Sequence, residues 1–220
     1  MSGPLALTVE TTADRYALVA SRGEAVLAAV DAPSNRKLDC EVFAALERVL
    51  SDAAVSLEQL DRLIVGRGPG SFVGTRIGLA VANTLALVRA IPTVGVDAFE
   101  PLADLGRARG WRDFLAAVNC VREEVFYRDY GPGGDRNAVS VARFDEFGVL
   151  AAGRPVVFRV TEMNRTLERA RVAGLPGVTI PDFPEIVRAM TALGLGAEVQ
   201  EGALPQPLYV KSEGARTWQP

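Results

Sequence analysis

The order of strand-like and helix-like segments in the first 96 residues is the feature that most limits the fold. Three apolar runs come first, and a turn at residues 21–24 joins the second to the third as a hairpin. A helix, a strand, a second helix and a further strand follow. These segments are Leu5–Val9, Tyr16–Ala20, Ala25–Val30, Leu38–Ala53, Leu63–Val65, Phe72–Arg89 and Thr93–Val96. The repeated strand–helix–strand order predicts an α/β fold with a parallel or mixed sheet and helices on its faces.

The second half of the chain predicts a similar mixture. Helices are expected at Ala98–Arg109 and Pro184–Leu193. Strands are expected at Phe114–Val118, Glu124–Tyr130, Val139–Phe144 and Leu208–Lys211. A boundary near residue 100 divides the chain into residues 1–100 and 101–220. Both parts open with strands, which leaves structural duplication open.

Composition excludes several classes of function. The net charge is -3 without a long basic run, which argues against a protein that grips nucleic acid by itself. Histidine is absent, so the commonest general base and transition-metal ligand are missing. Cys40 and Cys120 lack metal-ligand spacing and fit free thiols in a reducing cytosol. The apolar stretch Ile77–Ile91 is shorter than the ~20 residues of a membrane span. We therefore expect a soluble cytoplasmic protein.

The glycine-rich segment between Leu63–Val65 and the next helix contains Gly68, Gly70, Ser71 and Gly74. Ser71 is placed to cap the helix, and a helix start with free N–H groups is a natural anion site. The glycines could equally serve only a tight turn and close packing of the helix. A Walker loop is excluded because Thr75-Arg76 follows the last glycine, and the glycine spacing does not fit a dinucleotide fold.

Two further segments have a plain and a functional interpretation. Glu10, Thr11 and Thr12 follow the first strand and could position Mg²⁺ and a phosphate, although taken alone they fit an ordinary strand end. The helix Phe72–Arg89 is apolar nearly all round, which is typical of burial on all sides. A sheet covers one face of it. The rest could be covered by Leu38–Ala53 and by a partner protein.

The residues resemble one known family. The run from Gly68 to Gly78 resembles the signature of the TsaB (YeaZ) family, the bacterial partners of the tRNA threonylcarbamoyladenosine synthase TsaD. Leu5–Thr12 is similar to the family's opening strand and Asp-Thr-Ser motif, with Glu10 in place of Asp. Asn119–Tyr127 resembles its Asp-Ala-Arg segment, with Arg122 one place late. Leu208–Lys211 resembles the closing Pro-x-Tyr-x-Arg, with Lys211 in place of Arg.

The resemblance implies an actin-like ATPase (ASKHA, RNase H-like) fold of two small subdomains with mixed sheets. It implies a non-catalytic subunit that binds and activates or stabilises TsaD in a heterodimer for threonylcarbamoyladenosine (t6A37) formation. TsaE would join the larger complex, and tRNA would be contacted indirectly. For the chain alone, both a homodimer and a monomer stay open. No cofactor or metal is expected, with ATP or ADP only at the complex interface.

The expected site residues form two groups. The partner interface would comprise Leu38, Val42, Leu46, Phe72, Val73, Arg76, Ile77 and Ala80. A vestigial phosphate loop or structural loop would comprise Glu10, Thr11, Thr12, Gly68, Gly70, Ser71 and Gly74.

Two alternatives remain at this point. An active ATPase or small-molecule kinase of the same fold would need phosphate loops from both halves and a metal-positioning carboxylate, for which Glu10 is a candidate. A metalloprotease would need a ligand set such as two histidines on a helix, which the sequence lacks.

Overall fold

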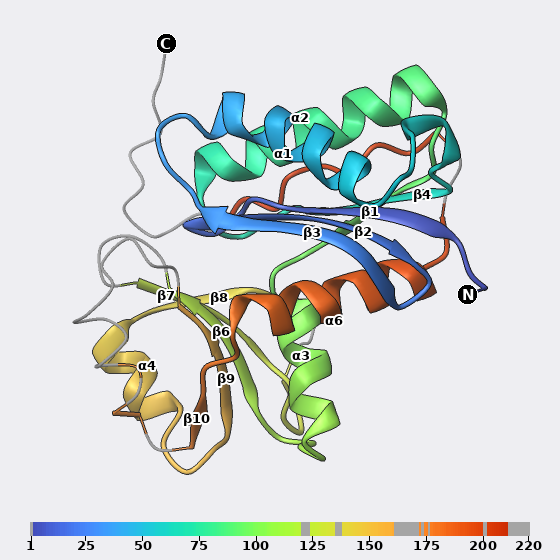
Figure 1. The fold of residues 1–220 in the computed structure, drawn as a ribbon. Helices are drawn as coiled ribbons and strands as arrows, with labels where there is room; N and C mark the ends of the chain where they lie inside the picture. Colours follow the sequence, from blue (N-terminus) through green and yellow to red (C-terminus); the bar gives the residue numbers. More distant parts are fainter. Residues whose placement is uncertain are drawn as a thin grey trace.

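Two five-stranded sheets form the body of the molecule (Figure 1). The computed structural model describes residues 2–119, 124–134, 138–160, 172, 174–175, 177–199 and 202–210. The first sheet and its helices comprise β1 (Leu5–Glu10), β2 (Arg15–Arg22), β3 (Ala25–Pro33), α1 (Leu38–Asp52), β4 (Arg62–Gly66), α2 (Phe72–Arg89) and β5 (Thr93–Val96), with a short 3-10 helix at Leu57–Gln59.

The second half repeats this plan. Its elements are α3 (Phe99–Ala108), β6 (Leu115–Asn119), β7 (Glu124–Asp129), β8 (Ser140–Arg143), α4 (Phe144–Leu150), β9 (Val156–Arg159), β10 (Val178–Thr179) and α6 (Phe183–Gly196). The sheets have the orders β3-β2-β1-β4-β5 and β8-β7-β6-β9-β10. In each, the first three strands are antiparallel, and the fourth and fifth run parallel to the first. The two halves are therefore structural duplicates.

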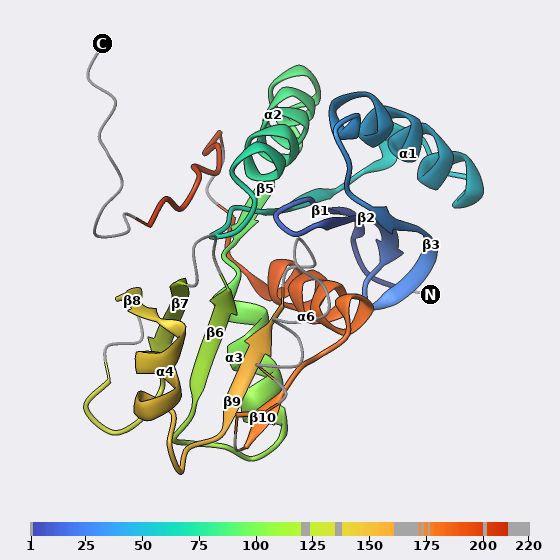
Figure 2. The same ribbon diagram turned by 90° about the vertical axis from the view of Figure 1, so that its left-hand side faces the viewer.

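Helices cover both faces of the first sheet. On one face α1 and α2 pack over β1, β2 and β4, burying a large apolar cluster that includes Leu7, Val49 and Ala82. On the opposite face α6 packs against β1, β4 and β5, with Met190 in contact with Ala6 and Ile64. Figure 2 shows α6 and α3 between the two sheets, where these two helices contact each other.

The packing of α6 shows that the division at residue 100 does not hold for the whole chain. Residues 183–196 return to the first sheet, where the absence of a side chain at Gly194 lets the helix approach Ile64 closely. The guanidinium of Arg62 on β4 closes the end of α6 by donating to the backbone oxygens of Gly194, Leu195 and Ala197 at 2.7–3.1 Å. The C-terminal half is therefore interlocked with the first sheet.

The local structure differs from the sequence-based expectations at a few places. Residues 208–210 are not a strand; they lie against the glycine-rich loop, with the Leu208 N–H donating to the Arg67 oxygen at 2.7 Å. Helix α1 begins after Lys37, whose N–H donates to the Asn35 side-chain oxygen at 2.7 Å. Helix α4 and strand β9 were not anticipated.

The length argument against a membrane span also fails. Helix α2 has 18 residues and meets the length and composition of a helix that could cross a membrane. It begins five residues before the apolar stretch on which the expectation rested. Its buried residues, among them Gly74, Leu79 and Ala82, pack on the first sheet, as in the core helix of a globular domain.

Candidate functional site

The glycine-rich loop and the end of β1 are tied together by short hydrogen bonds. The Ser71 N–H donates to the Thr12 oxygen at 2.6 Å, and the Thr11 hydroxyl donates to the Gly74 oxygen at 2.8 Å. Ser71 caps α2 as expected, since its Oγ accepts the Gly74 N–H at 3.1 Å. The predicted loop residues of β1 and α2 therefore meet in one place.

The glycines permit this contact. A Cβ at Gly70 would lie 2.0 Å from the Thr12 oxygen, and one at Gly74 would lie 1.9 Å from the Thr11 oxygen. A Cβ at Gly78 would lie 2.2 Å from the Thr11 hydroxyl oxygen. At Gly68 the reason differs, because φ is +86°, a conformation that favours glycine. Of the two interpretations of the loop, the geometry supports close packing of backbone on backbone.

The Glu10 carboxylate is committed to internal contacts. Its Oε1 accepts from the Thr12 N–H and hydroxyl, both at 2.6 Å, and from Arg159 Nη2 at 3.1 Å. The Glu10 and Arg159 side chains are each only 3% exposed. Arg159 ends β9, so this ion pair joins the two sheets. Such a carboxylate is poorly placed to hold Mg²⁺, which needs accessible oxygen ligands.

A second buried ion pair also crosses between the halves. Arg128 on β7 lies 2.8 Å from Asp97, and the other Asp97 oxygen accepts the N–H groups of Phe99 and Glu100 at the start of α3. Burial, together with the nearby Asp97 carboxylate, raises the pKa of Glu100 above its ordinary value. No group of three acidic or cysteine side chains within the described ranges is placed to hold a metal ion.

Helix α2 leaves part of its apolar surface uncovered. Phe72, Val73, Leu87 and Val88 are 54%, 62%, 70% and 71% exposed. Arg76 and Ala80 are also exposed, and Ile77 is half-buried. The exposed residues Phe72, Val73, Arg76, Ala80, Leu87 and Val88 are called the α2 face below. Several exposed large apolar side chains on one helix are typical of a protein–protein contact.

The three interface residues expected on α1 were assigned to the wrong side of the helix. Leu38, Val42 and Leu46 are buried in the core of the first sheet and cannot contact a partner. Their helical spacing is the signature of the core stripe itself. Phe43 lies off that stripe and is exposed instead, so a large apolar residue outside the core spacing is the signal for the outer side of α1.

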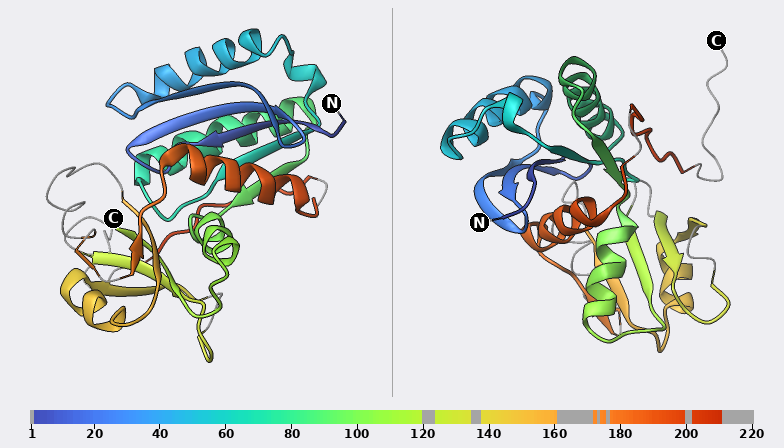
Figure 3. Two further views of the ribbon diagram at one scale, coloured as in Figure 1. Left: turned by 60° about the horizontal axis from the view of Figure 1, so that its bottom comes forward. Right: turned by 90° about the vertical axis from the view of Figure 1, so that its right-hand side faces the viewer.

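The segment 203–210, called the C-terminal strap below, runs beside α2 and β5 (Figure 3). The Asn83 amide of α2 donates to the Pro205 oxygen at 3.2 Å, and the Pro205 ring packs on Gly95. Tyr209 reaches the α2 face, where its ring lies 5.6 Å from that of Phe72. Asn119, the first residue of the segment that resembles the family's Asp-Ala-Arg motif, is buried and lines a cavity together with Tyr209 of the strap. Cys120–Arg122 and Lys211 lie outside the described residues.

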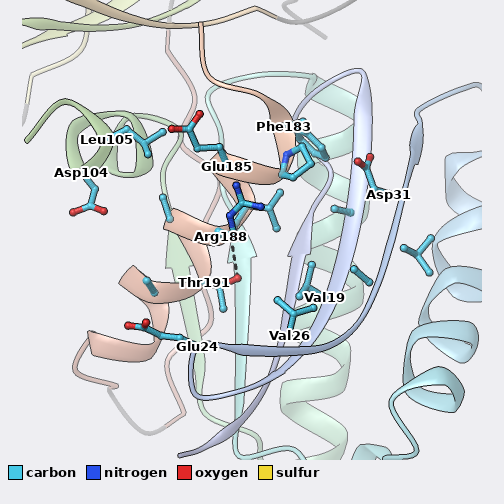
Figure 4. A pocket seen from close by; sticks show the side chains of 17 residues that line it. Val19, Glu24, Val26, Asp31, Asp104, Leu105, Phe183, Glu185, Arg188 and Thr191 are labelled. Atoms are coloured by element: carbon cyan, nitrogen blue, oxygen red, sulfur yellow. Dashed lines mark hydrogen bonds between the residues drawn. The ribbon is translucent and has the colours of Figure 1, made fainter. Parts of the chain in front are cut away.

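A groove of about 490 Å³ lies on the other face of the first sheet (Figure 4). Its walls are apolar side chains of β2, β3 and α6, including Val19, Val26 and Phe183. The carboxylates of Glu24 and Asp104 lie toward its edge, and Arg188 of α6 lies in the middle of the lining residues. None of the residues predicted for a site lines it, so it is separate from the loop and the α2 face.

Two sheets of identical strand order, with helices α3 and α6 between them, define the class of protein: an actin-like ATPase (ASKHA) fold. The solved structure described as YeaZ from *Pseudomonas aeruginosa* is similar in fold, with a TM-score of 0.71 and 21% identity over 96% of this chain and 100% of that one. The profile of the family described as TsaD: tRNA N6-adenosine threonylcarbamoyltransferase matches residues 34–198.

Curated relatives narrow the assignment. The chain is 36% identical over 86 residues to the tRNA threonylcarbamoyladenosine biosynthesis protein TsaB of *Escherichia coli*, covering 39% of this chain and 37% of that protein. It is 30% identical over 101 residues to the protein of the same description from *Bacillus subtilis*, covering 46% and 44%. The chain thus spans less than half the length of these two relatives. The profile match shows that the chain belongs to the family described as TsaD: tRNA N6-adenosine threonylcarbamoyltransferase. The similarities to TsaB and YeaZ proteins place it in the TsaB (YeaZ) branch of this family.

Proposed function

We propose that this chain is a non-catalytic subunit required for formation of threonylcarbamoyladenosine in tRNA. It acts by binding a TsaD-type transferase and activating or stabilising it. Support comes from membership of the TsaB branch and from relatives described as biosynthesis proteins of this nucleoside. In the complete system TsaE joins the larger complex, tRNA is contacted indirectly, and the work takes place in the cytoplasm.

One observation carries the non-catalytic part of the proposal: the Glu10 carboxylate is buried and paired with Arg159. In a phosphoryl-transfer enzyme of this fold, an acidic group near the first phosphate loop would be needed to position the metal. Here its Oε1 accepts three hydrogen bonds from the chain itself. The sequence also lacks histidine for acid–base chemistry. A nucleotide is therefore expected only at an interface with the partner.

The α2 face supports the second part of the proposal, that the chain binds a partner protein. Exposed Phe72, Val73, Leu87 and Val88 give one helix a row of large apolar side chains beside α1. Burying such a row stabilises a complex by the hydrophobic effect, and aromatic residues are enriched among the side chains that dominate interface energies. In the absence of the partner, the same face is expected to associate with a second copy.

The proposal is tested with a pair of valine substitutions. Val73→Asp places a charge on the α2 face, whereas Val149→Asp places one on α4, at an apolar side chain that is 77% exposed. We expect Val73→Asp to abolish co-purification with the cognate TsaD and the restoration of tRNA modification, and Val149→Asp to preserve both. Equal behaviour of the two variants would contradict docking through the α2 face.

Calorimetry with Mg-ATP separates the proposal from the alternative of an active ATPase or kinase. The isolated chain is expected to show no heat of binding and no hydrolysis, because Glu10 is occupied by Arg159 and Thr12. Tight binding with turnover by the isolated chain would establish the alternative.

A further inference from the structure

Arg76 is the one charged residue of the α2 face, and aromatic groups hold it in place. Its guanidinium carbon lies 3.7 Å from the centroid of the Phe72 ring. Its Nε donates a hydrogen bond of 3.0 Å to the Tyr209 hydroxyl. The Tyr209 ring in turn lies against Phe72, tilted by 37°. The side chain is therefore stacked on one side and hydrogen-bonded at its inner nitrogen.

The C-terminal strap fixes Tyr209, and with it Arg76. The strap is anchored at two points before Tyr209. The Leu208 N–H donates to the Arg67 oxygen, and the Asn83 amide donates to the Pro205 oxygen. A long arginine side chain loses rotamer freedom when a partner orders it. Here that ordering is largely complete before any partner arrives, which favours binding.

Among the residues that the structure describes, the charge of Arg76 has no counter-ion. No carboxylate oxygen of the described residues lies within 4.0 Å of its nitrogens, whereas Arg89 at the other end of α2 pairs with Glu58 at 2.6 Å. With Nε used by Tyr209, the terminal nitrogens remain as donors suited to a planar acceptor. Covering the α2 face with an apolar surface would bury this charge unpaired, at a large cost.

We infer that Arg76, positioned by Phe72 and Tyr209, receives a carboxylate of the docked partner. The inference rests on the proposed function and names the chemistry of the partner's surface: an apolar face that carries an Asp or Glu. Paired with this carboxylate, Arg76 contributes to affinity. Against an apolar surface without one, it opposes docking, so the residue selects the partner.

The test measures the affinity of the purified cognate TsaD for variants of this chain by titration calorimetry at several salt concentrations. Arg76→Met keeps the apolar stem and removes the charge. Tyr209→Phe keeps the ring and removes only the hydroxyl. Arg188→Met is the matched control. Arg188 is also exposed and has no carboxylate of the described part of the chain within 4.0 Å, but it lies on α6 on the opposite face of the sheet.

We expect Arg76→Met to weaken binding at least about 30-fold and to flatten its salt dependence. Tyr209→Phe should weaken binding about fivefold, as a lost positioning hydrogen bond does, and Arg188→Met should bind within about twofold of wild type. Scanning the partner's Asp and Glu residues should reveal one whose removal no longer matters once Arg76 is Met.

If the wild-type chain binds TsaD and the Arg76→Met variant binds it with the same affinity, this inference is overturned and the proposed function stands. The same holds if no partner carboxylate is coupled to Arg76. Absence of wild-type binding would overturn both. Thermal melts of each variant distinguish a lost contact from a lost fold.

Discussion

Replacing Arg159 by Met tests the ion pair that joins the two halves of the chain. The substitution keeps a long apolar side chain and removes the cation beside Glu10. Breaking a buried pair by removing one partner costs about 3–5 kcal/mol, because the remaining charge stays buried without compensation. The Thr12 N–H and hydroxyl still donate to Glu10, so we expect the lower end, about 3 kcal/mol.

The double variant Glu10→Gln with Arg159→Met isolates the charge. With the carboxylate neutralised, no unpaired charge remains, and the double variant should be more stable than the sum of the single effects by about 1–3 kcal/mol. Arg15→Met is the matched control. Its pair with Asp31 is 2.7 Å long but about 30% exposed, so its loss should cost at most about 1 kcal/mol.

Urea unfolding followed by circular dichroism measures these free energies. If Arg159→Met and Arg15→Met lower the midpoint equally, the Glu10–Arg159 pair does not join the halves energetically. The explanation of why Glu10 is unavailable to a metal would then also fall.

Three further predictions concern packing and charge. Gly74→Ala should lower the free energy of unfolding by about 3 kcal/mol, because the new Cβ would meet the Thr11 oxygen. Gly196→Ala, with open space around the new Cβ, should leave the free energy of unfolding unchanged. Equal effects of the two substitutions would refute the close contact at Gly74. Arg62→Met should speed amide hydrogen exchange in the last turn of α6, since three carbonyls lose their donor; unchanged protection would refute this cap. Glu100→Gln should stabilise the protein at pH 7, because burial raises the pKa of Glu100 and the charged carboxylate therefore costs stability in the folded state. This gain in stability should vanish below about pH 4, where Glu100 is protonated in both the folded and the unfolded state. A gain in stability that does not depend on pH would refute the prediction.

The sequence predicts the first half of the fold well because its elements are long and strongly periodic. The bounds of α2 and β5 agree with the structure, and β1 to β4 differ by at most three residues at each end. In the second half, β9 has four residues and α4 has seven, directly after β8 without an intervening loop. Such short segments do not show a period clearly enough to be distinguished.

The site was predicted in part. The meeting of Glu10–Thr12 with the glycine-rich loop follows from two adjacent parallel strands, β1 and β4, ending at the same edge. The pairing of Glu10 with Arg159 joins residues 149 positions apart and depends on how the two halves pack. Likewise, periodicity identifies an apolar stripe on α1 but does not say whether the core or a partner covers it. Burial of Leu38, Val42 and Leu46 against exposure of Phe43 is a tertiary property.

Reconstituted tRNA modification tests the central claim most directly. Threonylcarbamoyladenosine is quantified in tRNA incubated with the cognate TsaC, TsaD and TsaE while the concentration of this chain is raised. We predict no product without TsaD. With TsaD we predict a rise in product that saturates at one chain per TsaD and disappears with Val73→Asp. Product formed by this chain without TsaD, or full activity of Val73→Asp, would contradict the central claim.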